Sequence, residues 1–329
     1  MTNNNQQAIA SAIEKRASYI QEPHTAAFRL LNGFLENIPD LIIDIFGQTI
    51  VFHDYSDNDD VVTDLVPVIT GALPWLVTGL LKKRRSKKPE ELAGKIIFGE
   101  TLDTFIIENG VTYALDLNMN QDASFYLDTR NLRHFLKENM KDKSVLNTFA
   151  YTGSLGVAAL AGGAKDMIQL DLNKRFLTVA KRSVKLNGLV HDNNQNQEGD
   201  FWSRVNHFKL IGKLFDCVIL DPPVYSRTSK GIVDTTKNYY KLINKVRPVI
   251  ADGGYLITIN NALFQSGAEH TADLESLCQD GYLSIESTID VPEDCIGALE
   301  APINSLPSNP APYNHSTKIT VLRVKRKQQ

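Results

Sequence analysis

The first part of the chain alternates between helical and strand patterns of hydrophobic positions. Between Gln6 and Ile20 the apolar residues fall on one face of a helix with 3.6 residues per turn, at Ala8, Ile9, Ala12, Ile13 and Ala17. Two runs of apolar β-formers follow, 41–46 and 49–53, and Gly47-Gln48 separates them. This order predicts an amphipathic helix and then a strand, a turn and a second strand.

A long apolar stretch runs from Val61 to Leu81. Asp64, Pro67 and Pro74 interrupt it, and this pattern suits neither a membrane-spanning helix nor a continuous soluble helix. We therefore expect a helical region of buried core that ends at about Leu81. The sequence predicts no membrane-spanning segment.

A strand pair near 96–98 and 104–108 is expected to complete a small α+β domain over residues 1–105. Beyond it, strand patterns alternate with helical ones. Strands are expected at 144–148, 167–171, about 196–199, 215–220, 254–259, 283–289 and 317–324, and helices at 154–162, 174–187, 237–251 and 270–280. Strands separated by helices pair in parallel, whereas the last two strands follow one another directly. Residues 106–329 are therefore predicted to form a doubly wound, Rossmann-like α/β domain. Its seven-stranded sheet is expected to be mostly parallel, with an antiparallel last strand.

The composition is that of an ordinary globular protein, with 43% hydrophobic and 22% charged residues. The formal net charge is −3, so a nucleic acid would have to be bound by a local basic patch rather than by the whole surface. The run Lys82–Lys88 contains six basic residues in seven. Such a run is either a solvated turn or a contact for a phosphate backbone, and the sequence leaves both open.

Three cysteines, Cys217, Cys278 and Cys295, lack the spacing of metal ligands, so we predict no metal site. Their odd number and the absence of a signal-peptide pattern in the first residues indicate a reduced, cytoplasmic compartment. The segment Pro302–Pro312 carries four prolines without periodicity, and the sequence assigns it no role.

The strand expected at 215–220 is followed by Asp221-Pro222-Pro223-Val224-Tyr225. Two prolines stop the strand and stiffen the loop after it. Ligands of doubly wound sheets bind beyond the carboxyl ends of such strands, so Asp221, Pro222 and Tyr225 are the predicted catalytic residues. The Asp-Pro-Pro-aromatic order resembles the loop by which many S-adenosylmethionine (AdoMet) methyltransferases hold a planar target. Tyr225 would stack on a flipped base; the alternative is that it packs back onto the core.

A tight turn with a glycine follows the strand expected at 144–148. Gly153 lets the backbone approach a ligand closely, and the amides that start the next helix favour an anionic group such as the carboxylate of a methionine moiety. The spacing is not Gly-x-Gly-x-x-Gly, so the usual nicotinamide or flavin fingerprint is missing. Asp171 ends the next strand about 20 residues further on, where a ribose diol is usually held.

Gly199-Asp200-Phe201 ends the third strand. There Asp200 either accepts a hydrogen bond from an adenine amino group or caps the following helix, and the sequence favours neither role. Ligating corners at four successive strand ends predict a nucleotide-like cofactor. The cofactor-binding residues predicted from these ends are Asn147, Phe149, Ala150, Tyr151, Thr152, Gly153, Asp171, Leu172, Asn173, Gly199, Asp200, Phe201 and Asp221.

Taken together, these segments resemble the AdoMet-dependent large-subunit rRNA methyltransferases that modify carbon 5 of cytosine or nitrogen 7 of guanine. The resemblance spans nearly the whole chain and rests on 26–33, 41–46, 108–110, 124–130, 147–156 and 221–226. In the relatives the Phe-aromatic-Leu-Asp-x-Arg segment lines the cofactor pocket. The resemblance therefore implies that Phe125, Leu127, Asp128 and Arg130 bind AdoMet. Some members begin with an RNA-binding module, and we expect none here.

One departure from the family bears on the mechanism. Members that methylate carbon 5 of cytosine need a cysteine thiolate after the fifth strand, because that carbon is not nucleophilic unaided. Here this place reads Thr258-Ile259-Asn260-Asn261, without a cysteine. The pair Asn260-Asn261 instead resembles the guanine-modifying branch.

The sequence thus predicts an AdoMet-dependent methyltransferase that acts on a base nitrogen of RNA, most of all rRNA, without a cysteine nucleophile. One alternative keeps the enzyme and changes the target to a small molecule or a protein side chain. A second alternative is a nucleotide-binding module that transfers no methyl group. The missing dinucleotide fingerprint and the Asp-Pro-Pro loop argue against the second.

Overall fold

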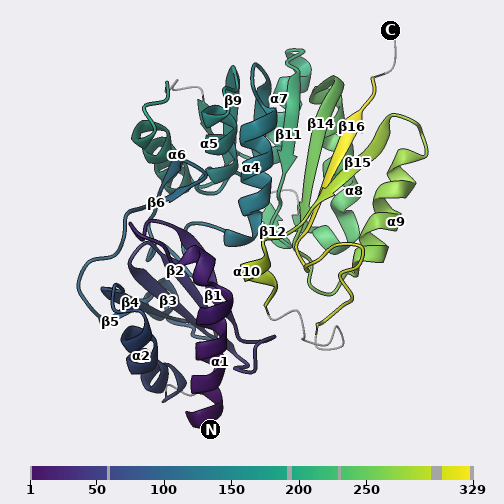
Figure 1. Cartoon of the computed structure of the whole chain (residues 1–329). Coiled ribbons are helices and arrows are strands. Elements are labelled where there is room, and N and C mark those ends of the chain that lie inside the picture. Colours follow the sequence, from purple (N-terminus) through teal and green to yellow (C-terminus); the bar gives the residue numbers. More distant parts are fainter. Residues whose placement is uncertain (1, 58–59, 191–194, 229–230, 298–305, 327–329) are drawn as a thin grey trace. The chain divides into compact units, whose positions relative to one another are not determined.

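The computed structural model describes residues 2–57, 60–190, 195–228, 231–297 and 306–326, with the backbone alone at 2–3, 60, 225–228 and 231–237. The chain falls into two compact units (Figure 1). Unit 1 comprises Met1–Asp128 and Pro292–Ser305, and unit 2 comprises Thr129–Val291 and Leu306–Gln329. The predicted domain boundary at residue 105 stays a prediction.

Unit 1 is built on a five-stranded sheet with the order β1-β2-β3-β4-β5. Its strands are β1 (Ala27–Asn32), β2 (Leu41–Phe46), β3 (Thr49–Asp54), β4 (Thr78–Lys83) and β5 (Lys95–Phe98). β2 and β3 are the predicted strand, turn and strand, and they pair antiparallel around Gly47, whose φ is 62°. β3 and β4 are parallel, so they need a crossover, which α2 (Asp60–Ala72) supplies.

The remaining elements of unit 1 are short apart from the N-terminal helix. Within the described residues they are α1 (Thr2–Lys15), a 3-10 helix (Ala17–Tyr19), α3 (Pro89–Ala93), the hairpin of β6 (Phe105–Glu108) and β7 (Val111–Ala114), and α10 (Glu293–Ile296). The amphipathic helix is confirmed, since Ile9 and Ala12 are buried in the same core as the sheet. α1 ends at Lys15, before the expected end at Ile20.

Two expectations for unit 1 are wrong. β5 pairs with β4 and β6 pairs with β7, so 96–98 and 104–108 are not a strand pair. α2 also continues through Pro67, and β4 already begins at Thr78. A proline costs a helix interior about 3 kcal/mol. Each fully buried aliphatic side chain contributes roughly 1.5–3 kcal/mol, so the buried face of α2, with Val62, Leu65 and Ile69, outweighs that cost.

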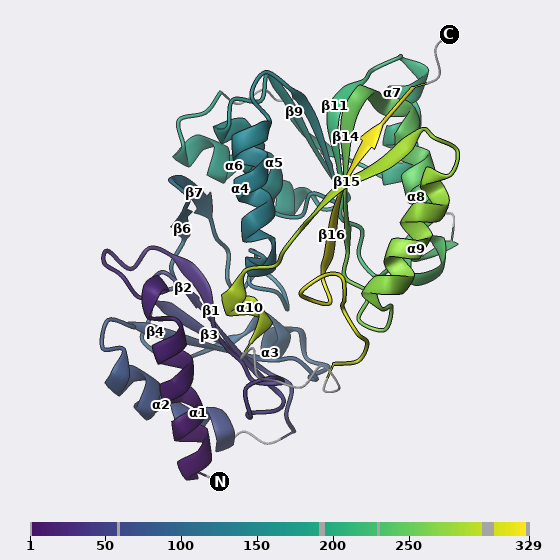
Figure 2. The same cartoon turned by 45° about the vertical axis from the view of Figure 1, so that its right-hand side comes forward.

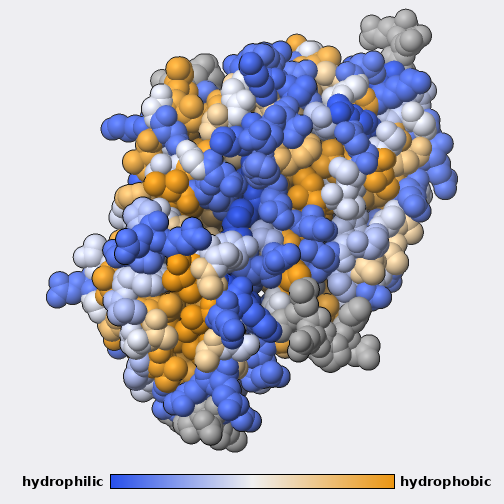
Figure 3. Space-filling model, viewed as in Figure 1, coloured by the Kyte–Doolittle hydropathy of each residue, from blue (hydrophilic) through white to orange (hydrophobic). Residues whose placement is uncertain are grey.

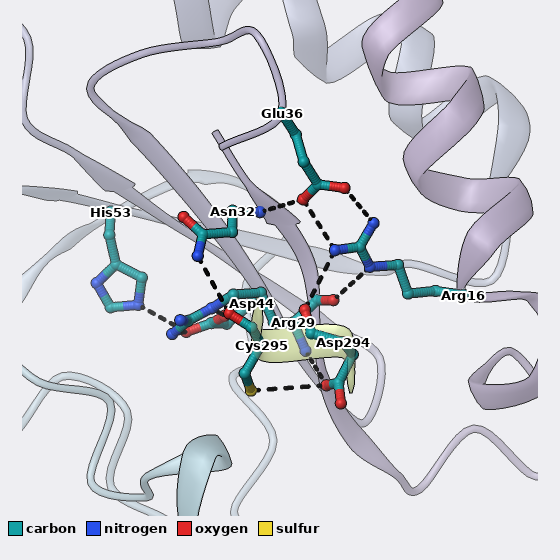
Figure 4. Close-up of polar contacts among 8 residues, drawn as sticks. All are labelled: Arg16, Arg29, Asn32, Glu36, Asp44, His53, Asp294 and Cys295. Carbon is teal, nitrogen blue, oxygen red and sulfur yellow. Dashed lines mark hydrogen bonds and ion pairs between the residues drawn. The ribbon is translucent and has the colours of Figure 1, made fainter. Parts of the chain in front are cut away.

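A segment from far along the chain completes unit 1. The segment is α10, which comes after β15 (Leu283–Ile289) of unit 2 in the sequence. It lies against β1 (Figure 4). The buried Asp294 carboxylate accepts a hydrogen bond from the backbone N–H of Arg29 at 2.8 Å, and Arg16 donates to the Asp294 carbonyl at 3.1 Å. Asn32 donates to the Cys295 carbonyl at 3.1 Å. Backbone and side-chain groups that would otherwise be buried without partners are thereby satisfied.

Unit 2 contains a seven-stranded sheet with the order β10-β9-β8-β11-β14-β16-β15. The strands are β8 (Ser144–Thr148), β9 (Asp166–Asp171), β10 (Asn196–Glu198), β11 (Phe215–Leu220), β14 (Ile250–Asn260), β15 (Leu283–Ile289) and β16 (Lys318–Val324). The first five strands in this order pair in parallel, whereas β16 is antiparallel to both of its neighbours. The predicted sheet, with its antiparallel last strand, is confirmed.

Helices cover both faces of this sheet, as Figure 2 shows. They are α4 (Arg130–Asn139), α5 (Ser154–Ala161) and α6 (Lys174–Leu186) on one face, and α7 (Phe201–Leu210), α8 (Thr235–Val246) and α9 (Gly267–Cys278) on the other. Two separate hydrophobic clusters fill the spaces between sheet and helices. A short hairpin, β12 (Tyr225–Thr228) and β13 (Gly231–Asp234), precedes α8. The described residues also form 3-10 helices at Leu127–Thr129, where unit 1 ends, and at Arg247–Val249.

The expected helix at 237–251 ends earlier than predicted. α8 stops at Val246, and Pro248 lies in the 3-10 turn that leads into β14. Proline disfavours a helical conformation for the residue before it, which accounts for this boundary. β14 consequently starts at Ile250, four residues before the predicted strand.

In the view of Figure 3, hydrophilic residues cover much of the surface, and hydrophobic residues gather in patches between them. Within the described residues, every helix is too short or too polar to cross a membrane.

Candidate active site

The candidate site lies at the carboxyl ends of the parallel strands of unit 2. From β8 the chain moves outward to β9 and β10 and then returns to β11 on the other side of β8. The strand order therefore reverses between β8 and β11. In open α/β sheets this switch point is where a crevice for a ligand forms.

The turn from β8 into α5 has an unusual backbone. Phe149 and Tyr151 have positive φ values of 54° and 50°, and Gly153 has a φ of 76°. Non-glycine residues seldom adopt this region, and such strained residues cluster at ligand sites. A Cβ on Gly153 would lie 2.3 Å from the side chain of Gln169. Only glycine fits this position, because the turn packs closely against β9 and Ala180 of α6. The predicted close approach of the backbone to a ligand stays a prediction.

Gln169 of β9 holds this turn from inside and is not among the residues predicted from the sequence. Its buried amide donates to the Gly153 carbonyl at 2.9 Å and accepts from the Asn147 amide at 2.8 Å. The Oδ1 atom of Asn147 is buried and has no hydrogen-bond partner within the described residues. A glutamine in the middle of a strand that is otherwise apolar is the signal that would have revealed this role.

Asp171 ends β9, and its side chain contacts the turn between β8 and α5. Its carboxylate accepts from the backbone N–H of Tyr151 and of Asn173, each at 2.8 Å. Burial raises the pKa of Asp171 above its usual value, although these amides oppose the shift. Leu172 is 61% exposed, and Asn173 caps α6 by accepting from Arg175. Asp171 therefore links the loop that follows β8 with the loop that follows β9. Its predicted contact with a ribose stays a prediction.

The third strand end shows the capping role for Asp200. Its carboxylate accepts from the backbone N–H and the hydroxyl of Ser203, each at 3.0 Å, at the start of α7. Phe201 stacks on Phe149 with ring centroids 4.8 Å apart. Aromatic rings from the loops after β8 and β10 thus lie against each other. The predicted contacts of Gly199, Asp200 and Phe201 with adenine stay predictions.

At the fourth corner, Asp221 follows β11 and Asn261 follows β14. The Asn261 amide donates to the Asp221 carboxylate at 3.3 Å. The buried Tyr239 hydroxyl lies 3.2 Å from the Leu220 carbonyl and 3.0 Å from the Ile259 carbonyl, so it ties the two strand ends together. Pro222 is buried beside them. Tyr225 begins β12, but its side chain lies outside the described part of the chain.

The three cysteines are buried to different extents. Cys217 and Cys295 are fully buried, and Cys278 is partly buried. Burial raises the pKa of Cys217 far above that of a free thiol and also raises the pKa of Cys278. A thiol reacts as the thiolate, so a raised pKa disfavours covalent catalysis.

The other predicted residues lie elsewhere in the chain. Arg130 is the first residue of α4 in unit 2. Phe125, Leu127 and Asp128 belong to unit 1, where they line a cavity with Arg29 and Asp44. The role of all four in binding AdoMet stays a prediction. No group of three or more histidine, cysteine or acidic side chains among the described residues is arranged to hold a metal ion.

Most of the basic run in unit 1 is engaged within the protein. Lys82 is buried, and its amine donates to the carbonyls of Ala93 at 2.5 Å and Asn120 at 2.8 Å. Lys83 pairs with the buried Asp54 at 2.6 Å. The remaining pairs are Arg84 with Asp122, Arg85 with Asp40, and Lys88 with Glu91. The exposed members of the run are Arg85, Lys87 and Lys88.

Comparison with known proteins identifies the class. Residues 70–272 match the family described as S-adenosylmethionine-dependent methyltransferase. This match covers more than half of the chain, so the chain belongs to that family. The family membership and the strand-end geometry agree on AdoMet as the cofactor.

One relative in sequence and two solved structures show what this chain is similar to. Ribosomal RNA large subunit methyltransferase I of Aeromonas hydrophila subsp. hydrophila is 31% identical over 256 residues, which are 75% of this chain and 64% of that protein. The chain thus spans less than two thirds of the length of that relative. The crystal structure of SMU.776 complexed with SAH has a TM-score of 0.85 at 22% identity, and covers 98% of this chain and 82% of that one. The SAM-dependent methyltransferase from Agrobacterium tumefaciens has a TM-score of 0.60 at 16% identity, with 88% of each chain covered. These structures confirm the predicted class I methyltransferase fold.

Proposed function

We propose that this chain transfers a methyl group from AdoMet to a base nitrogen of RNA, with ribosomal RNA as the substrate and no cysteine as nucleophile. The observation that carries the proposal is the hydrogen-bonded pair of Asp221 and Asn261 at the sheet's switch point. It presents a carboxylate and an amide, rather than a thiol, where a planar target would lie.

The residues of the β8–α5 turn fit AdoMet. After the left-handed Gly153, the backbone N–H groups that start α5 suit the carboxylate of the methionine moiety. Asp171 supplies a carboxylate beside this turn for the ribose hydroxyls. Bound AdoMet supplies an electrophilic methyl group on a sulfonium. The protein's own contribution is to hold the cofactor and the target in line.

Methylation of a ring nitrogen needs little more than positioning, because the nitrogen lone pair attacks directly. An exocyclic amine would need acceptors for its N–H groups, and Asp221 with the Pro222 carbonyl would provide them. The Asn261 amide fixes the orientation of the Asp221 carboxylate. Tyr239 and the stiff Asp-Pro-Pro loop keep that carboxylate at the strand end.

The choice of RNA rests on the resemblance and on the named relative. The Aeromonas relative is a ribosomal RNA methyltransferase by name and shares 31% of residues over the matched part. Two observations favour the alternative target, a small molecule or a protein side chain. The net charge is −3, and residues of the basic run form ion pairs with carboxylates of the protein itself.

The test is methyl transfer from labelled AdoMet to ribosomal RNA from a strain that lacks the gene. Mass spectrometry of the nucleosides should show one new base with a methyl group on nitrogen. Asp221→Asn should lower the rate by roughly 10²-fold, the effect of misplacing the target relative to the methyl group. Asp216→Asn, at the other end of β11, is the matched control and should keep the rate. Methylation of carbon 5 of cytosine, or of a small molecule alone, would overturn the proposal.

A further inference from the structure

A small cavity lies within unit 1, with a volume of about 190 Å³. Three aromatic residues, Tyr55, Phe125 and Tyr126, are among the residues that line it. Pockets for drug-sized ligands measure roughly 300–1,000 Å³. This cavity therefore suits one ring system and is too small for a whole AdoMet molecule. Tyr126 is 44% exposed, so its ring is accessible to a ligand.

One wall of the cavity is a buried polar group from β1, β2 and β3, shown in Figure 4. Arg29 donates to both carboxylate oxygens of Asp44, at 2.8 and 3.3 Å, and the His53 Nε2 atom lies 3.4 Å from Asp44. Burial is the largest single effect and would raise the pKa of Asp44, but Arg29 and His53 together outweigh it and hold that pKa below its usual range. Burial lowers the pKa of His53, which keeps the imidazole neutral near pH 7. Donors and acceptors are thus fixed in place before a ligand arrives.

A second ion pair lines the cavity, formed by Arg84 of the basic run and Asp122 of the loop before Tyr126. Arg84 lies 3.3 Å from Asp122, and its guanidinium carbon is 5.6 Å from the centre of the Tyr55 ring. The Tyr126 hydroxyl donates to the other oxygen of Asp122 at 3.1 Å. This chain of contacts orients both tyrosines and leaves planar groups along the cavity wall.

The charges of the wall select the kind of ligand. Two arginines face three carboxylates, those of Asp44, Asp122 and Asp128, while His53 is neutral. A phosphate would meet net negative charge here. A neutral planar ring whose edge both donates and accepts hydrogen bonds fits the aromatic and polar walls, and these are the properties of a nucleobase.

We propose that this cavity binds one unpaired base of the RNA substrate, stacked on Tyr126. The inference rests on RNA as the substrate of the proposed function. The adenine of AdoMet has the same chemistry, and Phe125, Leu127 and Asp128 are the residues that the family resemblance assigned to the cofactor. The experiment must therefore separate an RNA base from the cofactor.

The probe is a single-stranded RNA pool of about 15 nucleotides, close to the upper site size of single-strand binding domains. One 4-thiouridine in each molecule allows photocross-linking, and mass spectrometry locates the cross-linked peptide. We expect cross-links at Tyr55 or Tyr126, and these should persist with saturating S-adenosylhomocysteine. By fluorescence anisotropy, Tyr126→Ala should weaken RNA binding roughly 5- to 150-fold, the range for loss of one stacked base.

Two further variants separate stacking from stability. Tyr126→Phe keeps the ring and loses the hydroxyl that donates to Asp122, so it should restore most of the affinity. Phe105→Ala removes another exposed aromatic residue of unit 1 outside the cavity and should bind RNA as wild type does. Equal affinity of wild type and Tyr126→Ala, or loss of the cross-link with S-adenosylhomocysteine, overturns the cavity inference while RNA methylation still supports the proposed function. Failure of wild type to bind RNA overturns both.

Discussion

Asp171 is the residue on which cofactor binding is expected to depend most. Its carboxylate is held by two backbone amides of the loops on either side, and burial raises its pKa. A carboxylate in this position either binds the ribose hydroxyls or only ties the loops together. Affinity for AdoMet distinguishes the two roles.

Asp171→Ala should weaken AdoMet binding by roughly 1–3 kcal/mol, the cost of leaving buried hydrogen-bonding partners unpaired. Calorimetric titration measures this loss. A parallel titration with NAD, which should show no binding, tests the alternative of a nucleotide-binding module that transfers no methyl group. Asp166→Ala is the control, since Asp166 lies at the other end of β9 and pairs with Lys213. Unchanged affinity in Asp171→Ala would remove this residue from the cofactor site.

The cysteines give a second prediction at this scale. A variant with Cys217→Ala, Cys278→Ala and Cys295→Ala should keep methyl transfer if it folds, because the thiols are buried or have raised pKa values. Circular dichroism checks the fold, and the rate of methyl transfer is the measurement. A covalent complex trapped on RNA that contains 5-fluorocytosine would contradict a mechanism without cysteine.

Among the elements, β4 shows how a basic residue can serve the fold instead of a ligand. Lys82 points into unit 1 and anchors the segments around Ala93 and Asn120 by their carbonyls. Burial lowers its pKa from 10.5 to about 7. Between these values the unfolded chain holds a proton that the folded protein has lost. Stability from this residue should therefore rise with pH between about 7 and 10.5 and be lowest below pH 7.

Lys82→Met removes both the proton equilibrium and the two hydrogen bonds. The lost bonds should cost about 1–3 kcal/mol, and the advantage of wild type over the variant should grow as the pH rises from 7 to 9. Urea unfolding of both proteins at pH 6, 7.5 and 9 measures this difference, and other titrating groups cancel because both proteins share them. A difference that stays constant with pH would show that Lys82 keeps an ordinary pKa.

At the scale of the whole molecule, the exposed basic residues of the run Lys82–Lys88 are candidates for contacts with RNA. The net charge is −3, and the structure engages Lys82, Lys83 and Arg84 internally. Neutralising the entire basic run would therefore disturb unit 1 as well as any RNA contact. The informative changes are those at Arg85, Lys87 and Lys88, which are exposed.

The variant Arg85→Gln, Lys87→Gln, Lys88→Gln should bind RNA more weakly without a change in AdoMet affinity. Each lost phosphate contact should flatten the dependence of log K on log salt by about 0.7–0.9. Filter binding at several salt concentrations measures the slope. An unchanged slope together with unchanged activity would assign the run to the fold and would favour a target other than RNA.

The order of elements in unit 2 followed from the sequence because each strand there is a short apolar run that ends in a polar or proline-rich loop. The pattern of apolar residues and the glycine, proline or polar residues that bound it are enough to locate β8, β11 and β15. The glycine turn after β8 and the Asp-Pro-Pro loop after β11 mark the ends of those strands. These local signals also indicated where a cofactor would bind and that no cysteine follows β14.

Only the tertiary structure decided which residues meet across long stretches of sequence. Strand pairing was mistaken for β5 and β6 because neighbours in sequence need not be neighbours in a sheet. α2 passes Pro67 because its buried face outweighs the local cost, which no helix propensity reveals. The support of the site by Gln169 and Tyr239 is equally a matter of side chains brought together by folding. So is the cavity around Arg29 and Asp44, since its partners are separated by up to about a hundred residues of chain.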